Sequence, residues 1–271
     1  MTLMPPIPQA LSALSFETFG NEVPAALTQS VRAANVVQLR PMCSPCNLRG
    51  ICLPSVASDA GLDALESFSF RRTRIKAGEP LYREGDAFHF IYAVRMGTFK
   101  SSISLADGRE QISGFHMAGE MLGLDGFANG AHASSATALE DAEACVIPYL
   151  RLAEATAPNA ATRDIFSRLM SREIVREHSL MLLLGSMNAE ERLAAFLLNL
   201  SRRYAARGYS ATEFHLRMSR AEIGSYLGMT LETVSRTFSL FQQKRILDVD
   251  KRHICIIDLE RLSGVIETGL H

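Results

Sequence analysis

Three of the five cysteines in the chain lie close together near its N-terminal end, with the spacing C-x2-C-x5-C. They are Cys43, Cys46 and Cys52, and two further cysteines, Cys145 and Cys255, follow much later. Thiolates are soft ligands that suit iron–sulfur clusters and zinc. The first residues lack the charged segment of an export signal, so we expect a reducing compartment in which clustered cysteines bind metal rather than form disulfides. One of these two distant cysteines would complete a four-sulfur site with the three local thiolates.

The cysteine spacing alone leaves the identity of the metal open. It is not the C-x2-C-x2-C run of bacterial ferredoxins. Zinc sites often use two close pairs of ligands, whereas this chain has one triplet and one remote partner. The alternative is a set of ordinary core cysteines, and the clustering favours metal binding over it.

Length and composition describe an ordinary globular chain. The 271 residues suggest about two domains, and a hydrophobic content of 47% is ample for their cores. The net charge of −1 gives no overall basic signal, so any contact with nucleic acid must come from a local surface. No apolar run approaches the roughly 20 residues that a membrane helix needs, which predicts a cytoplasmic protein with no membrane partner.

Between Leu62 and Pro148 the pattern is one of short strands separated by glycine turns. Strands are predicted at residues 71–75, 90–94, 98–105, 134–138 and 144–147. Asp107-Gly108 lies between two such runs and is a strong hairpin signal. Many short strands at regular spacing predict a β-roll or a jelly-roll-like barrel.

A long helix is predicted from about Ala160 to Gly185. Its repeating positions are spaced by four and three residues, as in a coiled-coil seam, and they are Met170, Ile174, Glu177, Met181 and Leu184. The alternative is one amphipathic helix packed on its own domain. Glu177 favours the seam of a marginal homodimer, because two carboxylates would approach each other and resist association.

The C-terminal part carries a helix-turn-helix pattern. The stretch from Ser219 to Glu222 is a capping box that opens a short helix, and Gly228 marks the turn after it. Thr230 caps a second helix that runs to about Lys244. The second helix of such a pair enters the major groove of double-stranded DNA. Residues 246–247 and 253–257 are predicted to form a two-stranded wing.

Three polar residues share one face near the start of the second helix. Glu232, Ser235 and Arg236 lie at i, i+3 and i+4, where a recognition helix touches base edges. Arginine can grip guanine, and glutamate can accept from cytosine. The alternative is a surface salt bridge worth only ~0.3–0.5 kcal/mol. Basic residues that could contact phosphates, or equally be solvated surface charges, are Arg202, Arg203, Arg207, Arg217, Arg220, Lys244 and Arg245.

Two glycine motifs resemble the cyclic-nucleotide-binding roll of the CRP/FNR superfamily. They are Gly78-Glu79-Pro80-Leu81-Tyr82-Arg83-Glu84-Gly85-Asp86 and Gly119-Glu120-Met121-Leu122-Gly123. In nucleotide-binding members an Arg-Ser pair holds the cyclic phosphate, and the matching place here is Ser134-Ser135. Without a guanidinium the bidentate clamp is missing, so we expect the roll to serve as a scaffold.

The whole set of motifs resembles FNR-type, oxygen-responsive transcription regulators of that superfamily. The motifs are the cysteine spacing, Cys145 within residues 143–148, the run Asn-Ala-Glu-Glu-Arg-Leu-Ala-Ala-Phe at 188–196, and Glu232-x2-Ser235-Arg236. The resemblance implies a [4Fe–4S] cluster whose ligands are Cys43, Cys46, Cys52 and Cys145. Cys255 matches no ligand position and is predicted to be a wing-core residue.

The resemblance also implies how the regulator works and what it binds. Oxygen would convert the cluster, loosen the homodimer and release palindromic operators with TTGAT-like half-sites. The genes controlled would serve anaerobic or low-oxygen metabolism. The hairpin from Asp107 to Glu110 falls where family members touch RNA polymerase, and Arg109 puts a positive charge where an acid is often found.

The predicted fold class is α+β, with four parts. They are a flexible extension (1–40), a cysteine loop with a β-roll sensor domain (41–158), a dimerisation helix (159–186) and a winged helix-turn-helix domain (187–271). The alternative function is a regulator of the same fold that responds to a cyclic nucleotide or to thiol redox state, with zinc or no metal at the cysteines. The sequence offers no nucleophile–base pair, so we expect no enzymatic activity.

Overall fold

The computed structural model describes residues 46–48, 51–52, 71–150 and 160–267. The predicted N-terminal extension and Cys43 lie outside the described residues. Within the described part, no helix is both long enough and apolar enough to cross a bilayer.

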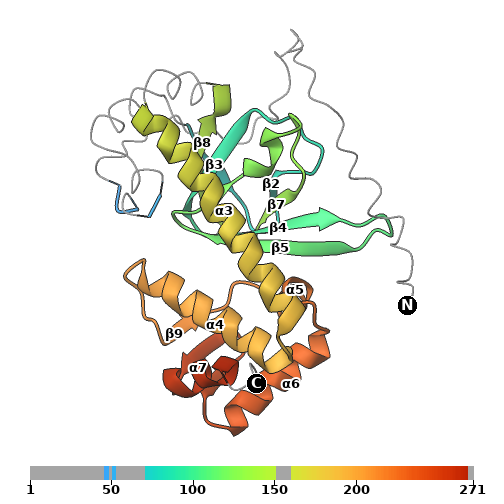
Figure 1. Cartoon of the computed structure of the whole chain (residues 1–271), viewed down its shortest axis with the longest axis vertical. Coiled ribbons are helices and arrows are strands. Elements are labelled where there is room, and N and C mark those ends of the chain that lie inside the picture. The colour runs from blue at the N-terminus through green and yellow to red at the C-terminus, as the bar shows by residue number, and fades with distance from the viewer. Residues whose placement is uncertain (1–45, 49–50, 53–70, 151–159, 268–271) are drawn as a thin grey trace, which may run out of the picture. The chain divides into compact units, whose positions relative to one another are not determined.

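The first part of the described chain is a roll of two four-stranded antiparallel sheets (Figure 1). Its strands are β1 (Arg71–Ile75), β2 (Pro80–Tyr82), β3 (Phe90–Met96), β4 (Thr98–Ser104), β5 (Glu110–Met117), β6 (Met121–Leu122), β7 (Ser135–Ala138) and β8 (Ala142–Pro148). One sheet has the order β1-β8-β3-β6 and the other has the order β2-β7-β4-β5. The predicted β-roll is therefore confirmed, and the turn at Asp107-Gly108 joins β4 to β5 as expected.

Both faces of the first sheet are buried, because successive side chains of β8 point to opposite faces and each set packs in an apolar cluster. Ala142 and Ala144 belong to the core inside the roll, together with Val94 of β3. Ile147 belongs to a second apolar cluster on the opposite face, where Leu169 of the long helix also packs. This outer face is the one that carries Cys145.

Two long helices follow the roll: α3 (Ala160–Ser186) and α4 (Ala189–Ala205). Asn188 begins α4 with the predicted capping box, because its side chain accepts from the amide of Glu191 and the Glu191 carboxylate accepts from the amide of Asn188. Leu193 and Leu197 of α4 are completely buried in the core of the C-terminal part.

The C-terminal part is a helix-turn-helix with a small sheet. Its elements are β9 (Glu213–His215), α5 (Arg220–Leu227), α6 (Leu231–Gln243), β10 (Leu247–Asp250), β11 (His253–Ile256) and α7 (Leu259–Glu267). The predicted pair of wing strands is present as the antiparallel strands β10 and β11, and a third strand that was not predicted, β9, pairs with β11 to give the order β10-β11-β9. Strand β9 is only three residues long, too short to show a period. Helix α7, which was not predicted, packs against α4 and buries Leu262.

The prediction for Cys255 also needs correction. Cys255 lies in β11, but the buried residues of that strand are Ile254 and Ile256. Since successive side chains alternate between faces, Cys255 points away from the core and is half-buried on the other side.

Candidate functional site

Cys145 lies in the middle of a sheet face that is covered by other parts of the chain. It pairs with Arg72 of β1 on one side and with Ala93 of β3 on the other. Residues directly opposite each other in antiparallel strands share a face. Cys145 therefore projects from the outer face of the first sheet, between a cationic and a small side chain.

The described cysteines of the N-terminal segment meet this same face. Cys52 packs, like Cys145, against the apolar cluster around Ile91 and Met121. Cys46 accepts a hydrogen bond from Arg95 of β3, with 3.8 Å between Nη1 and Sγ. The amides of Ile51 and Cys52 both donate to the carbonyl of Leu48 at 2.9 Å, which makes a tight turn between the two cysteines. The fold thus brings Cys46 and Cys52 to the sheet that carries Cys145.

The charges around Cys145 are mainly positive. Glu143, two residues earlier on the same face, lies 2.9 Å from Nε of Arg95, 3.8 Å from Nε of Arg72 and 3.7 Å from Nε of Arg74. One carboxylate thus faces three guanidinium groups. The Nε atom of Arg72 is buried, and the described part of the chain offers it no hydrogen-bond acceptor. A buried donor without an acceptor is costly. An anionic group beside Cys145 would supply one.

This face therefore suits a metal centre held by thiolates, since such a centre carries net negative charge. The excess of arginine does not distinguish an iron–sulfur cluster from zinc. Cys43 lies outside the described residues, and among the described residues no three side chains of His, Cys, Asp or Glu come together as a metal-binding group. The described residues thus show three of the predicted ligands and the arginines on one sheet face, but they do not show four sulfurs brought together.

Aromatic rings stack on one another in the interior of the roll. The rings of Tyr82 and His132 stack with centroids 3.9 Å apart, and Tyr92 stacks on Tyr82 at 5.5 Å. Burial raises the pKa of Tyr92 to about 12, so the ring is neutral. Ser134 donates to Asp125, and Ser135 accepts from the amide of Glu84. Both serines that replace the Arg-Ser pair are thus used within the protein.

The helix-turn-helix depends on a close approach that only glycine permits. A Cβ atom on Gly224 of α5 would lie 2.6 Å from the carbonyl oxygen of Met229, so no larger residue fits without a shift of the backbone. Gly228 ends α5 in the left-handed conformation, with φ of 62°. Thr230 then begins α6 by accepting from the amide of Thr233.

The three predicted base-reading residues lie on the exposed side of α6. The buried side is formed by Val234, Thr237, Phe238 and Phe241. Glu232, Ser235 and Arg236 are all exposed. Arg236 lies 3.5 Å from the hydroxyl of Thr233, the only hydrogen-bond partner that the described residues offer it. Its guanidinium is available for a ligand in solution.

Three of the basic residues considered for phosphate contact have structural roles instead. Arg203 and Arg207 of α4 bind the carboxylate of Glu120 in the roll. Arg220 lies over the ring of Phe238, with its guanidinium carbon 3.4 Å from the ring centroid. Burial lowers the pKa of Arg220, which is half-buried, to about 10. Sequence spacing gave no signal for these contacts, because the partners are far apart in the chain.

The predicted seam forms an exposed stripe along α3. Ile174 and Met181 are 52% and 69% exposed, which is unusual for large apolar side chains, and Glu177 is also exposed. Met170 and Leu184, at the two ends of the stripe, are half-buried. Leu183, on the opposite side of the helix, packs against the core of the C-terminal part. Helix α3 therefore packs both ends of the seam within its own chain, at Met170 and Leu184, and leaves the middle of the seam exposed.

Two domain families match the chain. Residues 72–159 match the cyclic nucleotide-binding domain, and residues 191–265 match the Crp-like helix-turn-helix domain. A roll, a long helix and a helix-turn-helix in this order define a DNA-binding transcription regulator and not an enzyme. The predicted fold class is confirmed.

Known proteins similar to the chain are transcription regulators. The chain is 46% identical over 224 residues to the transcriptional regulatory protein btr of Bordetella pertussis, covering 83% of this chain and 93% of that protein. It is 45% identical over 224 residues to the transcriptional activator protein Anr of Pseudomonas protegens, covering 82% and 91%. It is 41% identical over 223 residues to the fumarate and nitrate reduction regulatory protein of Salmonella typhimurium, covering 82% and 89%. The chain belongs to the CRP/FNR family of transcription regulators, and within it resembles the FNR, Anr and Btr proteins.

A solved structure supports the same relationship. The structure of FixK2 from Bradyrhizobium japonicum superimposes with a TM-score of 0.67 at 32% sequence identity, covering 73% of this chain and 98% of that chain.

Proposed function

We propose that this regulator senses oxygen through a [4Fe–4S] cluster held by four cysteines, Cys43, Cys46, Cys52 and Cys145. A bound cluster of this kind supplies iron–sulfur bonds that oxygen attacks. The observation that supports the proposal is the convergence of Cys46, Cys52 and Cys145 on one sheet face rich in arginine. Arg72 and Arg95 would balance the negative charge of the thiolates and, through their contacts with Glu143, would stabilise the arrangement of side chains on this face.

The same proposal assigns the DNA contact and the dimer. Glu232, Ser235 and Arg236 would read base edges in palindromic operators with TTGAT-like half-sites. The uncovered stripe of α3 would pair with its copy in a second chain, which explains the exposure of Ile174 and Met181. The dimer form would control genes for anaerobic or low-oxygen metabolism and would contact RNA polymerase.

We also propose the division of the chain that follows from these roles. The extension comprises residues 1–40, the sensor domain 41–158, the dimerisation helix 159–186 and the DNA-binding domain 187–271. The sensor and DNA-binding domains would operate in the cytoplasm.

A cyclic nucleotide is a weaker candidate for the signal. The aromatic stack of Tyr82, Tyr92 and His132 occupies the inside of the roll, and Ser134 and Ser135 already have partners. A response to thiol redox state, with zinc at the cysteines, remains the alternative to be tested.

Anaerobic purification followed by iron, sulfide and zinc analysis tests the proposal. We expect about four irons and four sulfides per chain and a visible absorption that bleaches in air. Operator affinity and the dimer fraction should fall together with that absorption. Stoichiometric zinc, or no metal in protein that was never exposed to air, would contradict the oxygen-sensing proposal while leaving the DNA-binding assignment intact.

A further inference from the structure

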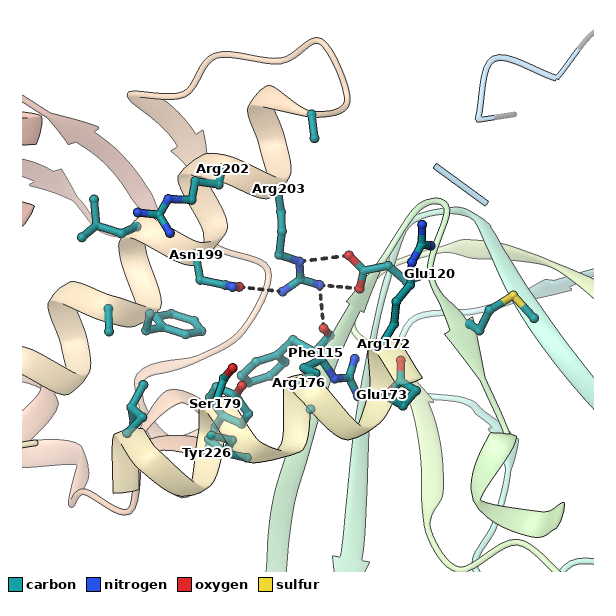
Figure 2. A pocket seen from close by; sticks show the side chains of 18 of the residues that line it. Phe115, Glu120, Arg172, Glu173, Arg176, Ser179, Asn199, Arg202, Arg203 and Tyr226 are labelled. Carbon is teal, nitrogen blue, oxygen red and sulfur yellow. Dashed lines mark hydrogen bonds and ion pairs between the residues drawn. The ribbon is translucent and has the colours of Figure 1, made fainter. Parts of the chain in front are cut away.

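Glu120 of the roll binds two arginines of helix α4. The Nε and Nη2 atoms of Arg203 donate to its two carboxylate oxygens at 3.0 Å and 2.6 Å, and Nη2 of Arg207 donates at 2.6 Å (Figure 2 shows the Arg203 contacts). This bidentate arrangement is the strong form of a carboxylate–guanidinium contact. It joins the sensor part of the chain to the first helix of the DNA-binding part.

Backbone carbonyl groups of the roll hold the same two arginines. Nη2 of Arg203 donates to the carbonyl of Phe115, and Nε of Arg207 donates to the carbonyl of Ala118, both at 2.7 Å. Burial alone would raise the pKa of Glu120, but the charges and hydrogen bonds of Arg203 and Arg207 outweigh it and lower the pKa. The carboxylate is therefore ionised at neutral pH.

The residue before Glu120 touches the cysteine segment directly. A Cβ atom on Gly119 would lie 2.8 Å from Cγ2 of Ile51, and the amide nitrogen of Cys52 lies 3.8 Å from the same point. Ile51 and Cys52 thus rest on a position that only glycine can occupy, at φ of 88°. Any movement of the segment changes the packing on the turn that presents Glu120.

The turn is also attached to the sheet that carries Cys145. The amide of Gly119 donates to the carbonyl of Val94 at 2.7 Å, and the amide of Val94 donates to the carbonyl of Glu120 at 2.9 Å. Val94 pairs in turn with Ala144, next to Cys145. The cysteine segment at Ile51 and Cys52 therefore touches this turn directly, and the strand that carries Cys145 is linked to the turn through Val94.

We propose that Glu120 is a positioning residue that transmits the state of the cysteine segment to the DNA-binding part within one chain. Ile51 and Cys52 pack against the turn at residues 119–120, and this turn positions the carboxylate of Glu120. The carboxylate in turn binds Arg203 and Arg207 of α4. This route is additional to any change in dimerisation through α3. It rests on the proposed function in one respect, namely that the cysteine segment is the part that responds to the signal.

A cavity lies beside the contact between Glu120 and the two arginines, but a ligand in it is not needed to explain where the guanidinium groups of Arg203 and Arg207 point. It measures about 640 Å³ and is lined by residues of the roll, α3 and α4, including Arg172, Arg176 and Arg202 (Figure 2). Arg203 and Arg207, which also line it, direct their donors to Glu120 and to backbone carbonyl groups. The acceptors that these two arginines use belong to the protein itself.

The test compares wild type with Glu120→Gln in the full-length protein, purified anaerobically. The quantity measured is the ratio of operator affinities between the metal-loaded and the metal-free form. We expect Glu120→Gln to keep its metal content and its dimer fraction, while the ratio falls by about tenfold, within the usual range of coupling between two sites. Glu120→Asp, which keeps the charge, should restore part of the ratio. Asp141→Asn, which breaks the exposed pair between Asp141 and Lys76, is the control and should leave the ratio unchanged.

Two results would overturn the proposal for Glu120 alone. One is a Glu120→Gln protein with the wild-type ratio. The other is an equal loss of affinity in both forms with a lower melting temperature, which would mark Glu120 as a structural brace only.

A wild-type protein without any metal dependence would overturn the proposed function, and hydrogen exchange then decides the role of Glu120. Ile51→Ala removes the side chain that presses on Gly119, and it should speed exchange in α4. In the Glu120→Gln background the same change should have no added effect, because coupled residues are not additive. Additive effects on α4 would overturn the link.

Discussion

The Nη1 atom of Arg176 in α3 lies 3.2 Å from Nδ1 of His116, a buried residue of β5. Arginine can only donate, so Nδ1 accepts and the proton of the neutral ring is on Nε2, which lies 3.0 Å from the hydroxyl of Ser101. Burial and the charges of Arg176 and Arg203 hold the pKa of His116 well below its usual value of 6.5. A neutral histidine thus joins the long helix to the roll.

Acid should therefore destabilise the protein through His116. The pKa of His116 is lower in the folded than in the unfolded state, so the unfolded state binds more protons as the pH falls below 6.5. The contribution of neutral His116 to the free energy of unfolding is therefore fully present above pH 6.5 and is lost progressively below it. The slope is at most about 1.4 kcal/mol per pH unit for one proton. Thermal unfolding between pH 7.5 and 5.5 measures it. His116→Gln should flatten the dependence, and His89→Gln, outside this contact, should not.

Gly224→Ala should destabilise the helix-turn-helix. The new Cβ would meet the carbonyl oxygen of Met229 at 2.6 Å, and overpacking of this kind costs about 1–3 kcal/mol. Gly264→Ala in α7 is a matched control with the opposite sign, because open space surrounds the added Cβ and alanine favours a helix by about 1 kcal/mol. Denaturant unfolding measures both changes, and equal destabilisation by the two would refute the steric argument.

Arg236→Ala should weaken sequence discrimination by about 1–3 kcal/mol and leave dimerisation unchanged. The exposed guanidinium of Arg236 has no acid within ion-pair distance among the described residues, so its removal leaves no buried charge behind. Binding to an operator and to a mismatched site measures the difference. Gln243→Ala, exposed at the far end of α6, is the control. Unchanged operator preference would remove Arg236 from the reading face.

Glu177→Ala should favour the dimer in the absence of the signal. The carboxylate of Glu177 lies 3.8 Å from Arg176, which offsets only part of the repulsion expected between two seam carboxylates. Removing the Glu177 carboxylate from both chains of the dimer should strengthen association by about 1 kcal/mol or more. Sedimentation of the metal-free protein measures the monomer–dimer balance, with Ser171→Ala as an exposed control on the same helix. An unchanged balance would exclude Glu177 as the residue that keeps the dimer marginal.

Cys145→Ser should abolish the proposed cluster, whereas Cys255→Ser should retain it. Cys145 lies on the arginine-rich face beside Arg72, and Cys255 lies in β11 of the C-terminal sheet. Iron content after anaerobic purification should fall from about four per chain to near zero in Cys145→Ser only. An intact cluster spectrum in that variant would remove Cys145 from the ligand set.

The sequence by itself determined the elements whose signals are local. The capping boxes at Asn188 and Ser219, the hairpin at Asp107-Gly108 and the exposed face of Glu232, Ser235 and Arg236 were all predicted from spacings of a few residues. Such signals depend on hydrogen bonds and side-chain periods within one turn or one hairpin. The strand β9 was not predicted, because three residues are too few to show an alternating pattern.

Only the tertiary structure decided which distant residues meet. Arg203 and Arg207 looked like candidates for DNA phosphates, but the fold brings them to Glu120, more than eighty residues earlier. Strand register placed Arg72 beside Cys145, and packing set Ile51 on Gly119. Contacts between residues so far apart depend on register and packing, which no local pattern of side chains specifies.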